Sequence, residues 1–150
     1  MYTLVVVDMQ YEFKAALDSN VQNHCSNAIT KAVLDRASVV YLEYIDQGET
    51  LKCLSSITRF YDRAHYITKI DWDGADEALQ VVKQFKLASK RFKICGVYSE
   101  CCVHDTVRGL TQLAPTAKIE VIKDACWSTN IKDHTRGIEK MSKFKNVKVV

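Results

Sequence analysis

The strongest constraint on the fold is the almost unbroken apolar run at residues 2–7, which ends at Asp8. A run without polar and apolar alternation is typical of a strand that is buried on both faces of a parallel sheet. Stretches with helical spacing of apolar residues alternate with further strand-like runs, and this alternation predicts helices on both faces of one sheet. The predicted strands are residues 2–7, 38–44, 64–69, 92–97, 118–122 and 146–150. The predicted helices are residues 20–36, a helix or helical turn from about 51, 75–86, 101–113 and 131–144, with loops at 70–74 and 124–129.

The sequence therefore predicts an α/β protein with three α/β/α layers and a six-stranded, mainly parallel sheet. Its 150 residues form one domain, residues 1–150, that is long enough for a substantial core. A formal net charge of +3 with scattered basic residues argues against a nucleic-acid partner. No apolar run is long enough to span a membrane, and no signal peptide is visible. The six cysteines lack disulfide-framework or CxxC spacing, so we expect free thiols and a cytoplasmic location.

Right-handed connections between parallel strands bring Asp8, Lys69 and the turn after residue 97 to one edge of the sheet. Ser99 has the properties of a helix N-cap, which puts Cys102 at the third helical position. There the helix dipole and free N–H groups favour a thiolate and can hold an oxyanion. Neighbouring helical residues point about 100° apart, so we expect Cys102 and not Cys101 to face a substrate. Ordinary structural roles also fit: a buried helix cysteine, a loop-capping aspartate and a solvated lysine.

Four sequence segments together resemble one known family. Residues 96–103 (Gly-Val-Tyr-Ser-Glu-Cys-Cys-Val) are similar to the nucleophile segment of the isochorismatase-like cysteine hydrolases, the family of nicotinamidases and N-carbamoylsarcosine amidases. The other matching segments occur in the family's order along almost the whole chain. They are residues 5–10 with Asp8 and Gln10, residues 67–69 with Lys69, and the weaker set Asp124, Ala125, Ser128 and His134.

The resemblance implies a six-stranded parallel sheet and an Asp-Lys-Cys catalytic triad. Cys102 is then the nucleophile and Asp8 the general base, while the Lys69 ammonium holds the Asp8 carboxylate and favours the thiolate. The backbone N–H groups of Tyr98 and Cys102 are the implied oxyanion hole, and the peptide bond between Val97 and Tyr98 is implied to be cis.

The chain departs from the family pattern in three places. Most relatives have a small residue where Tyr98 stands, so its ring is expected to narrow or reshape the pocket. Nicotinamidases carry Asp-x-His metal ligands after the second strand, whereas this chain has Asp46, Gln47 and Gly48 there, so we predict no metal and no other cofactor. The segment between Asp46 and Lys69 is also short, which predicts a reduced lid.

The sequence thus predicts a metal-independent cysteine hydrolase that cleaves an amide-like C–N bond of a small molecule through a Cys102 thioester. Candidate substrate-binding residues are Phe13, Tyr44, Trp72, Tyr98 and Trp127. All of them except Tyr98 are equally suited to a place in the hydrophobic core. One alternative is a non-catalytic family member that binds a metabolite or a protein, which the short lid and Tyr98 favour. Another is an isochorismatase-type ether hydrolase, although that enzyme lacks the cysteine. The resemblance further implies that copies of the chain can form a homo-oligomer.

Overall fold

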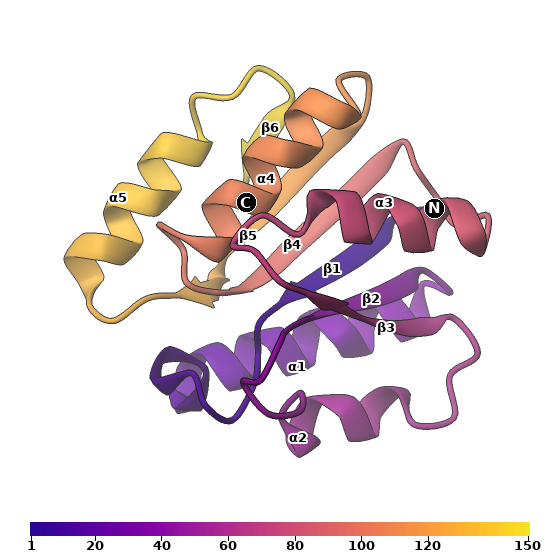
Figure 1. The fold of residues 1–150 in the computed structure, drawn as a ribbon, viewed down its shortest axis with the longest axis horizontal. Coiled ribbons are helices and arrows are strands. Elements are labelled where there is room, and N and C mark those ends of the chain that lie inside the picture. The colour runs from indigo at the N-terminus through magenta and orange to yellow at the C-terminus, as the bar shows by residue number, and fades with distance from the viewer.

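The computed structural model describes residues 1–150, which form one sheet with helices on both faces (Figure 1). The strands are β1 (Thr3–Val7), β2 (Ser38–Tyr44), β3 (Ala64–Lys69), β4 (Arg91–Val97), β5 (Lys118–Trp127) and β6 (Val147–Val149). The helices are α1 (Ser19–Leu34), α2 (Lys52–Ser55), α3 (Ala75–Gln84), α4 (Cys102–Leu113) and α5 (Ile131–Met141), with short 3₁₀ helices η1 (Lys14–Leu17) and η2 (Ser56–Thr58). The predicted three-layer α/β fold is confirmed.

All six strands are parallel and lie in the order β3-β2-β1-β4-β5-β6. The chain adds strands outward from β1 to β3 and then returns to place β4 on the other side of β1. Val5 of β1 is therefore paired with Val40 of β2 and Ile94 of β4. The carboxyl ends of β1 and β4 flank this reversal of strand order, where open α/β sheets bind ligands.

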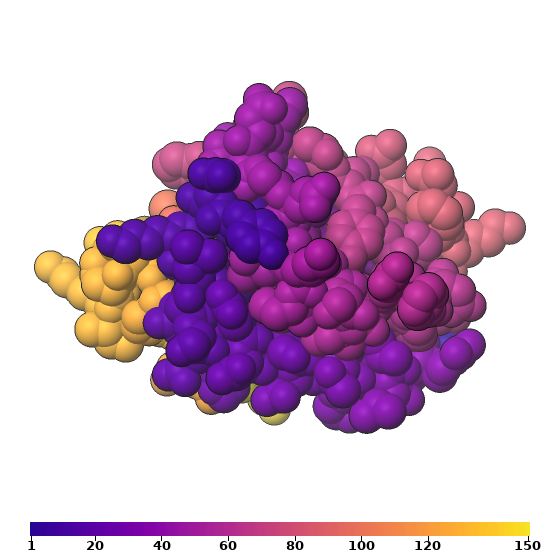
Figure 2. Space-filling model, turned by 90° about the horizontal axis from the view of Figure 1, so that it is seen from below, coloured from indigo at the N-terminus to yellow at the C-terminus, as the bar shows by residue number.

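Alternate residues of β1 belong to two separate cores. Val5 and Val7 pack with residues of α3, α4 and α5, whereas Leu4 and Val6 pack with residues of α1 and α2. Figure 2 shows the second of these faces, which the indigo-to-magenta first half of the chain largely covers. Burial on both faces explains why β1 is apolar without alternation. None of the helices combines the length and the apolar character that crossing a membrane requires.

Strand β5 is longer than predicted, because it continues to Trp127 where the sequence indicates a loop from residue 124. The register with β4 shifts midway, so that Ile94 pairs with Val121 but Gly96 pairs with Cys126. An irregularity of this kind bends a strand without ending it. The polar residues at 123 and 124 fall inside it, which is why the sequence pattern stops too early.

Helix ends also differ from the prediction. Helix α1 begins at Ser19 because the Asp18 carboxylate caps it, accepting hydrogen bonds from the N–H groups of Asn20 and Val21. The C-terminal ends of α1, α3 and α5 come two or three residues earlier than predicted, whereas α4 ends at Leu113 as expected.

Gly96 allows the close approach of β4 to β1 near their carboxyl ends. Its φ angle is +124°, and a Cβ atom there would collide with the backbone of Val7. Any other residue would therefore push the two strands apart. This contact holds the turn after β4 beside Asp8, the residue that follows β1.

Candidate active site

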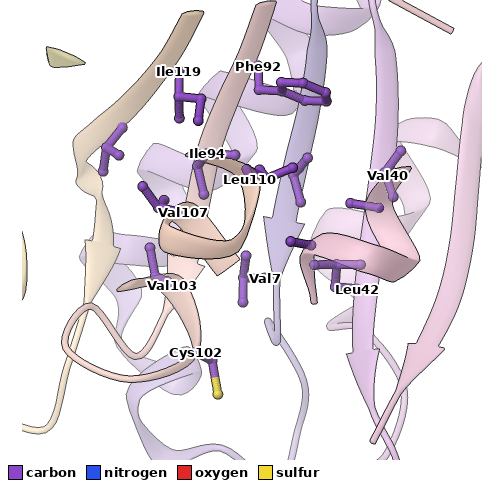
Figure 3. Packing of buried hydrophobic residues seen from close by; sticks show 14 of the residues in the cluster. Val7, Val40, Leu42, Phe92, Ile94, Cys102, Val103, Val107, Leu110 and Ile119 are labelled. Carbon is purple, nitrogen blue, oxygen red and sulfur yellow. The ribbon is translucent and has the colours of Figure 1, made fainter. Parts of the chain in front are cut away.

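Cys102 lies at the carboxyl edge of the sheet. It is the first residue of α4 and continues the inward-facing row Val103, Val107 and Leu110 (Figure 3). The sulfur points away from that row, beyond the strand ends, although the residue is only 5% exposed. A side chain in this position presents its sulfur to the space beyond the carboxyl ends of the strands, while its backbone stays in the core.

The predicted helix cap is wrong. Cys101 is the N-cap of α4 and makes no side-chain capping bond, so Cys102 stands at the first helical position and not the third. The Ser99 hydroxyl is instead within 2.7 Å of Nδ1 of His134, and the Ser99 N–H donates to the carbonyl of Trp127 at 2.9 Å. Partners distant in the sequence thus take the groups that a local cap would use.

Asp8 and Lys69 form a fully buried ion pair below Cys102. Lys69 Nζ lies 3.0 Å from Asp8 Oδ2, and neither side chain is exposed to solvent. The ammonium also donates to the carbonyls of Asp71 at 2.8 Å and Trp72 at 3.3 Å, and it lies 4.5 Å from the centre of the Tyr44 ring. These contacts compensate a charge that would otherwise be costly to bury.

The favoured protonation state of Cys102 is the neutral thiol and not the thiolate that the sequence predicts. Burial raises the pKa of Asp8 to about 6, against the opposing effects of the Lys69 ammonium and the contact with Cys102. Burial first, and the Asp8 carboxylate second, raise the pKa of the Cys102 thiol well above its usual range, while Lys69 opposes them. The resting pair is therefore a thiol beside a carboxylate, which is the arrangement a general base requires.

Two backbone N–H groups of the turn between β4 and α4, those of Tyr98 and Cys102, lack a partner in the protein. The bond between Val97 and Tyr98 is cis. The Tyr98 N–H, just beyond β4, donates to no acceptor in the protein. The Cys102 N–H belongs to the first turn of α4, where N–H groups have no partner in a preceding turn. Both donors are available to a ligand oxygen.

A cavity of about 340 Å³ opens above the sulfur of Cys102. Its wall consists of Phe13, Tyr44, Gln47, Trp72, Tyr98, Cys101 and Cys102. Four aromatic residues predicted to bind substrate are therefore present. The Phe13 ring meets those of Tyr44 and Tyr98 edge-on, with centroids 6.2 Å and 5.7 Å apart.

The cavity also corrects two expectations. Trp127 does not line it and faces a separate cavity with His134. Cys101 does line it, because this residue precedes the helix and the 100° separation of helical neighbours does not apply. Gln47 is a wall residue that the sequence did not reveal. Its position in the loop that follows the carboxyl end of β2, three residues after Tyr44, is the signal that the sequence offers.

The turn that carries Tyr98 and Cys102 is held from behind by β5 and α5. His134 contacts Ser99 as described, and the Ser128 hydroxyl donates a hydrogen bond to the Glu100 carboxylate. Gly137 packs so tightly on the Ser99 backbone that a Cβ atom would collide with it. The weak sequence signature that includes Ser128 and His134 thus corresponds to a structural support for the turn that carries Tyr98 and Cys102.

Gln10 stabilises the loop after β2 in a similar way. Its Nε2 donates to the carbonyls of Tyr44 at 3.0 Å and Gly48 at 2.6 Å, and its Oε1 accepts from the Tyr44 N–H at 2.7 Å. The side chain is fully buried, so these bonds satisfy all but one of its hydrogen-bonding sites without water. Gln10 therefore fixes one wall of the cavity.

The residues near the cavity do not fit a metal ion. No three His, Cys, Asp or Glu side chains anywhere in the chain are grouped so that they could hold one. The loop after β2, where Asp-x-His ligands are expected in nicotinamidases, contains Asp46 and Glu49 but no histidine.

Comparison with known families agrees with this fold. Residues 2–149 match the family model described as the isochorismatase domain. The chain therefore belongs to the isochorismatase family, a family of hydrolases. No curated protein matches the sequence closely enough to add to this.

Several solved structures are similar over the whole chain. The nicotinamidase from Staphylococcus aureus has a TM-score of 0.83 at 19% identity, covering 99% of this chain and 98% of its own. A pyrazinamidase from Pyrococcus horikoshii, solved in complex with zinc, has a TM-score of 0.80 at 19% identity, with coverage of 99% and 98%. A ribonuclease from Caenorhabditis elegans has a TM-score of 0.81 at 16% identity, covering 99% of this chain and 76% of its own. At these identities the likeness establishes the fold alone.

Proposed function

We propose that this protein is a metal-independent cysteine hydrolase that cleaves the C–N bond of a small carboxamide, with Asp8, Lys69 and Cys102 as its triad. The observation that carries the proposal is the fully buried ion pair between Lys69 Nζ and Asp8 Oδ2, 3.0 Å apart, in contact with a thiol that opens into a cavity. A buried charge pair without a catalytic task is an expensive feature to place under a pocket. Similar structures named nicotinamidase and pyrazinamidase support a carboxamide substrate.

In the first half-reaction the Asp8 carboxylate takes the proton of the Cys102 thiol as the sulfur attacks the amide carbon. The resulting oxyanion accepts hydrogen bonds from the N–H groups of Tyr98 and Cys102. When the C–N bond breaks, Asp8 returns the proton to the departing nitrogen. The products are ammonia or an amine and a thioester on Cys102.

In the second half-reaction water attacks the thioester carbon and Asp8 accepts a proton from that water. Collapse of the second oxyanion breaks the C–S bond and releases a carboxylic acid, while Asp8 returns its proton to the Cys102 sulfur. Before each proton is taken up, the Lys69 ammonium favours the ionised form of the buried Asp8 carboxylate. Atoms and charge balance without a metal or a redox partner.

The test is release of ammonia from a panel of small primary carboxamides, measured with purified wild type and with Cys102→Ala. We expect turnover of at least one compound by the wild type and none by the variant. Cys53→Ala is the matched control, because Cys53 is an exposed cysteine that does not line the cavity, and it should keep full activity. Binding of carboxamides without turnover would instead support the non-catalytic alternative.

A further inference from the structure

Gln47 differs in kind from the other residues of the active-site cavity. The rest of the wall is aromatic side chains and the two thiols, so Gln47 supplies its one amide side chain. Its backbone is engaged, because its carbonyl accepts from Glu12 N and its N–H donates to the Tyr44 carbonyl, each at 3.4 Å. Its half-buried side-chain amide has no hydrogen-bond partner in the protein and remains available to a ligand.

The loop that carries Gln47 holds the backbone of this residue in place. Gln10 bridges the two sides of the loop through Tyr44 and Gly48. Asp46 and Gly48, on either side of Gln47, have φ angles of 59° and 76°, which define a tight left-handed turn. The backbone of Gln47 is therefore ordered before a ligand binds, so that only its side chain loses conformational freedom on binding.

The charges around the cavity restrict the ligand that Gln47 can meet. The wall contains no carboxylate, lysine or arginine. Below it, Asp8 and Lys69 neutralise each other and are fully buried. A charged ligand would lose water without gaining a partner of opposite charge, and the wall therefore favours a neutral one.

The aromatic walls restrict its shape. The Phe13 ring stands nearly perpendicular to the rings of Tyr44 and Tyr98, at 88° in both cases, and Trp72 completes the wall. Such surfaces give a flat ring stacking and edge contacts that a branched aliphatic group does not obtain. The ligand that fits is flat and uncharged.

We propose that Gln47 is a specificity-determining residue, whose side-chain NH₂ group donates a hydrogen bond to an acceptor atom in the ring of a neutral, flat carboxamide. This inference rests on the proposed function for the identity of the scissile group, but it concerns recognition and not bond cleavage. Because one neutral hydrogen bond is involved, the ring acceptor should improve affinity by about threefold to tenfold.

The test uses three probes of nearly the same shape: benzamide, which has no ring nitrogen, nicotinamide and pyrazinamide. Dissociation constants are measured by ligand-observed NMR on Cys102→Ala, which prevents turnover, and on the same protein with Gln47→Leu added. We expect the two acceptor-bearing probes to bind more tightly than benzamide by the stated factor, and Gln47→Leu to abolish that difference. Gln84→Leu, on the exposed surface of α3, is the matched control and should preserve it.

Each outcome separates this inference from the proposed function. A preference that depends on Gln47, with no ammonia release by the wild type, supports the recognition role and overturns the hydrolase. Ammonia release combined with a preference that survives Gln47→Leu overturns the recognition role and leaves the hydrolase standing. Equal affinity for all three probes, or no binding of any of them, also overturns it.

Discussion

Replacing Lys69 with methionine tests how the buried ion pair controls the base. The change keeps the length and apolar stem of the side chain and removes the ammonium that lies 3.0 Å from Asp8 Oδ2. Because that cation lowers the pKa of Asp8, its loss must raise the pKa further above the value of about 6. It also removes the influence that opposes the raised pKa of the Cys102 thiol.

The size of the effect follows from the charge separation. A neighbouring opposite charge lowers a carboxyl pKa by about 1–3 units, so Lys69→Met should move the pKa of Asp8 to about 7–9. With a pKa of about 6, roughly nine-tenths of Asp8 is ionised at pH 7; with a pKa of about 8, roughly one-tenth is. Base-assisted reaction at pH 7 should therefore fall about tenfold and recover as the pH is raised.

The assay is the rate of iodoacetamide alkylation of Cys102 between about pH 5 and pH 9, with mass spectrometry to locate the label. In the wild type the rate should fall below about pH 6, where Asp8 becomes protonated and stops accepting the thiol proton. In Lys69→Met this fall should begin at higher pH. Lys83→Met, which removes an exposed lysine from α3, should match the wild type.

An unchanged or lowered midpoint in a folded Lys69→Met protein would refute the electrostatic role of Lys69. Removing one partner of a buried ion pair destabilises proteins by about 3–5 kcal/mol. Circular dichroism is therefore needed to establish whether Lys69→Met folds. Should it unfold, Lys69→Arg retains the cation and its midpoint should stay near that of the wild type. A large upward shift in Lys69→Arg would count equally against the reasoning.

Three further predictions concern the cysteines, the turn support and metal. Cys102→Ala should abolish rapid alkylation while Cys101→Ala leaves it largely intact, because of the two only Cys102 contacts the Asp8 carboxylate. A fast label on Cys101, detected by peptide mass spectrometry, would reverse this assignment. His134→Ala should lower kcat by about tenfold or more with little change in KM, because it frees Ser99 and with it the proposed oxyanion donors. His134→Asn should recover part of the loss, and a change in KM alone would contradict this prediction. Chelators should leave ammonia release unchanged and elemental analysis should find no stoichiometric metal, because no ligand set is present; activity restored by added metal would show otherwise.

The sequence was sufficient to predict which strand ends lie beside the site. The apolar runs that become β1, β3 and β4 end at Asp8, Lys69 and the turn before Cys102, and parallel connections bring those ends together. The meeting of these three side chains could therefore be expected before their distances were known. The length of β5 could not, because its register shift places polar residues inside a strand.

The local errors around Cys102 share one cause. Ser99 looked like a helix cap because its natural competitor, His134, lies 35 positions away in the sequence. The thiol looked acidic because the helix end was visible, whereas the burial and the neighbouring carboxylate that raise its pKa depend on tertiary packing. The position of the loop that carries Gln47 likewise depends on hydrogen bonds from Gln10, which span 34 to 38 positions in the sequence. Local patterns carry no information on such partners.

The most direct test of the account is to look for the acyl group on Cys102. The wild type is mixed with a carboxamide that it hydrolyses, the reaction is stopped with acid during turnover, and the peptide containing Cys102 is analysed by mass spectrometry. Reaction in the presence of hydroxylamine, which intercepts thioesters, provides the matching product measurement. We predict an adduct with the mass of the acyl group on Cys102, and a hydroxamate when hydroxylamine is present. Turnover that yields neither product, or that persists in Cys102→Ala, would contradict the proposed mechanism.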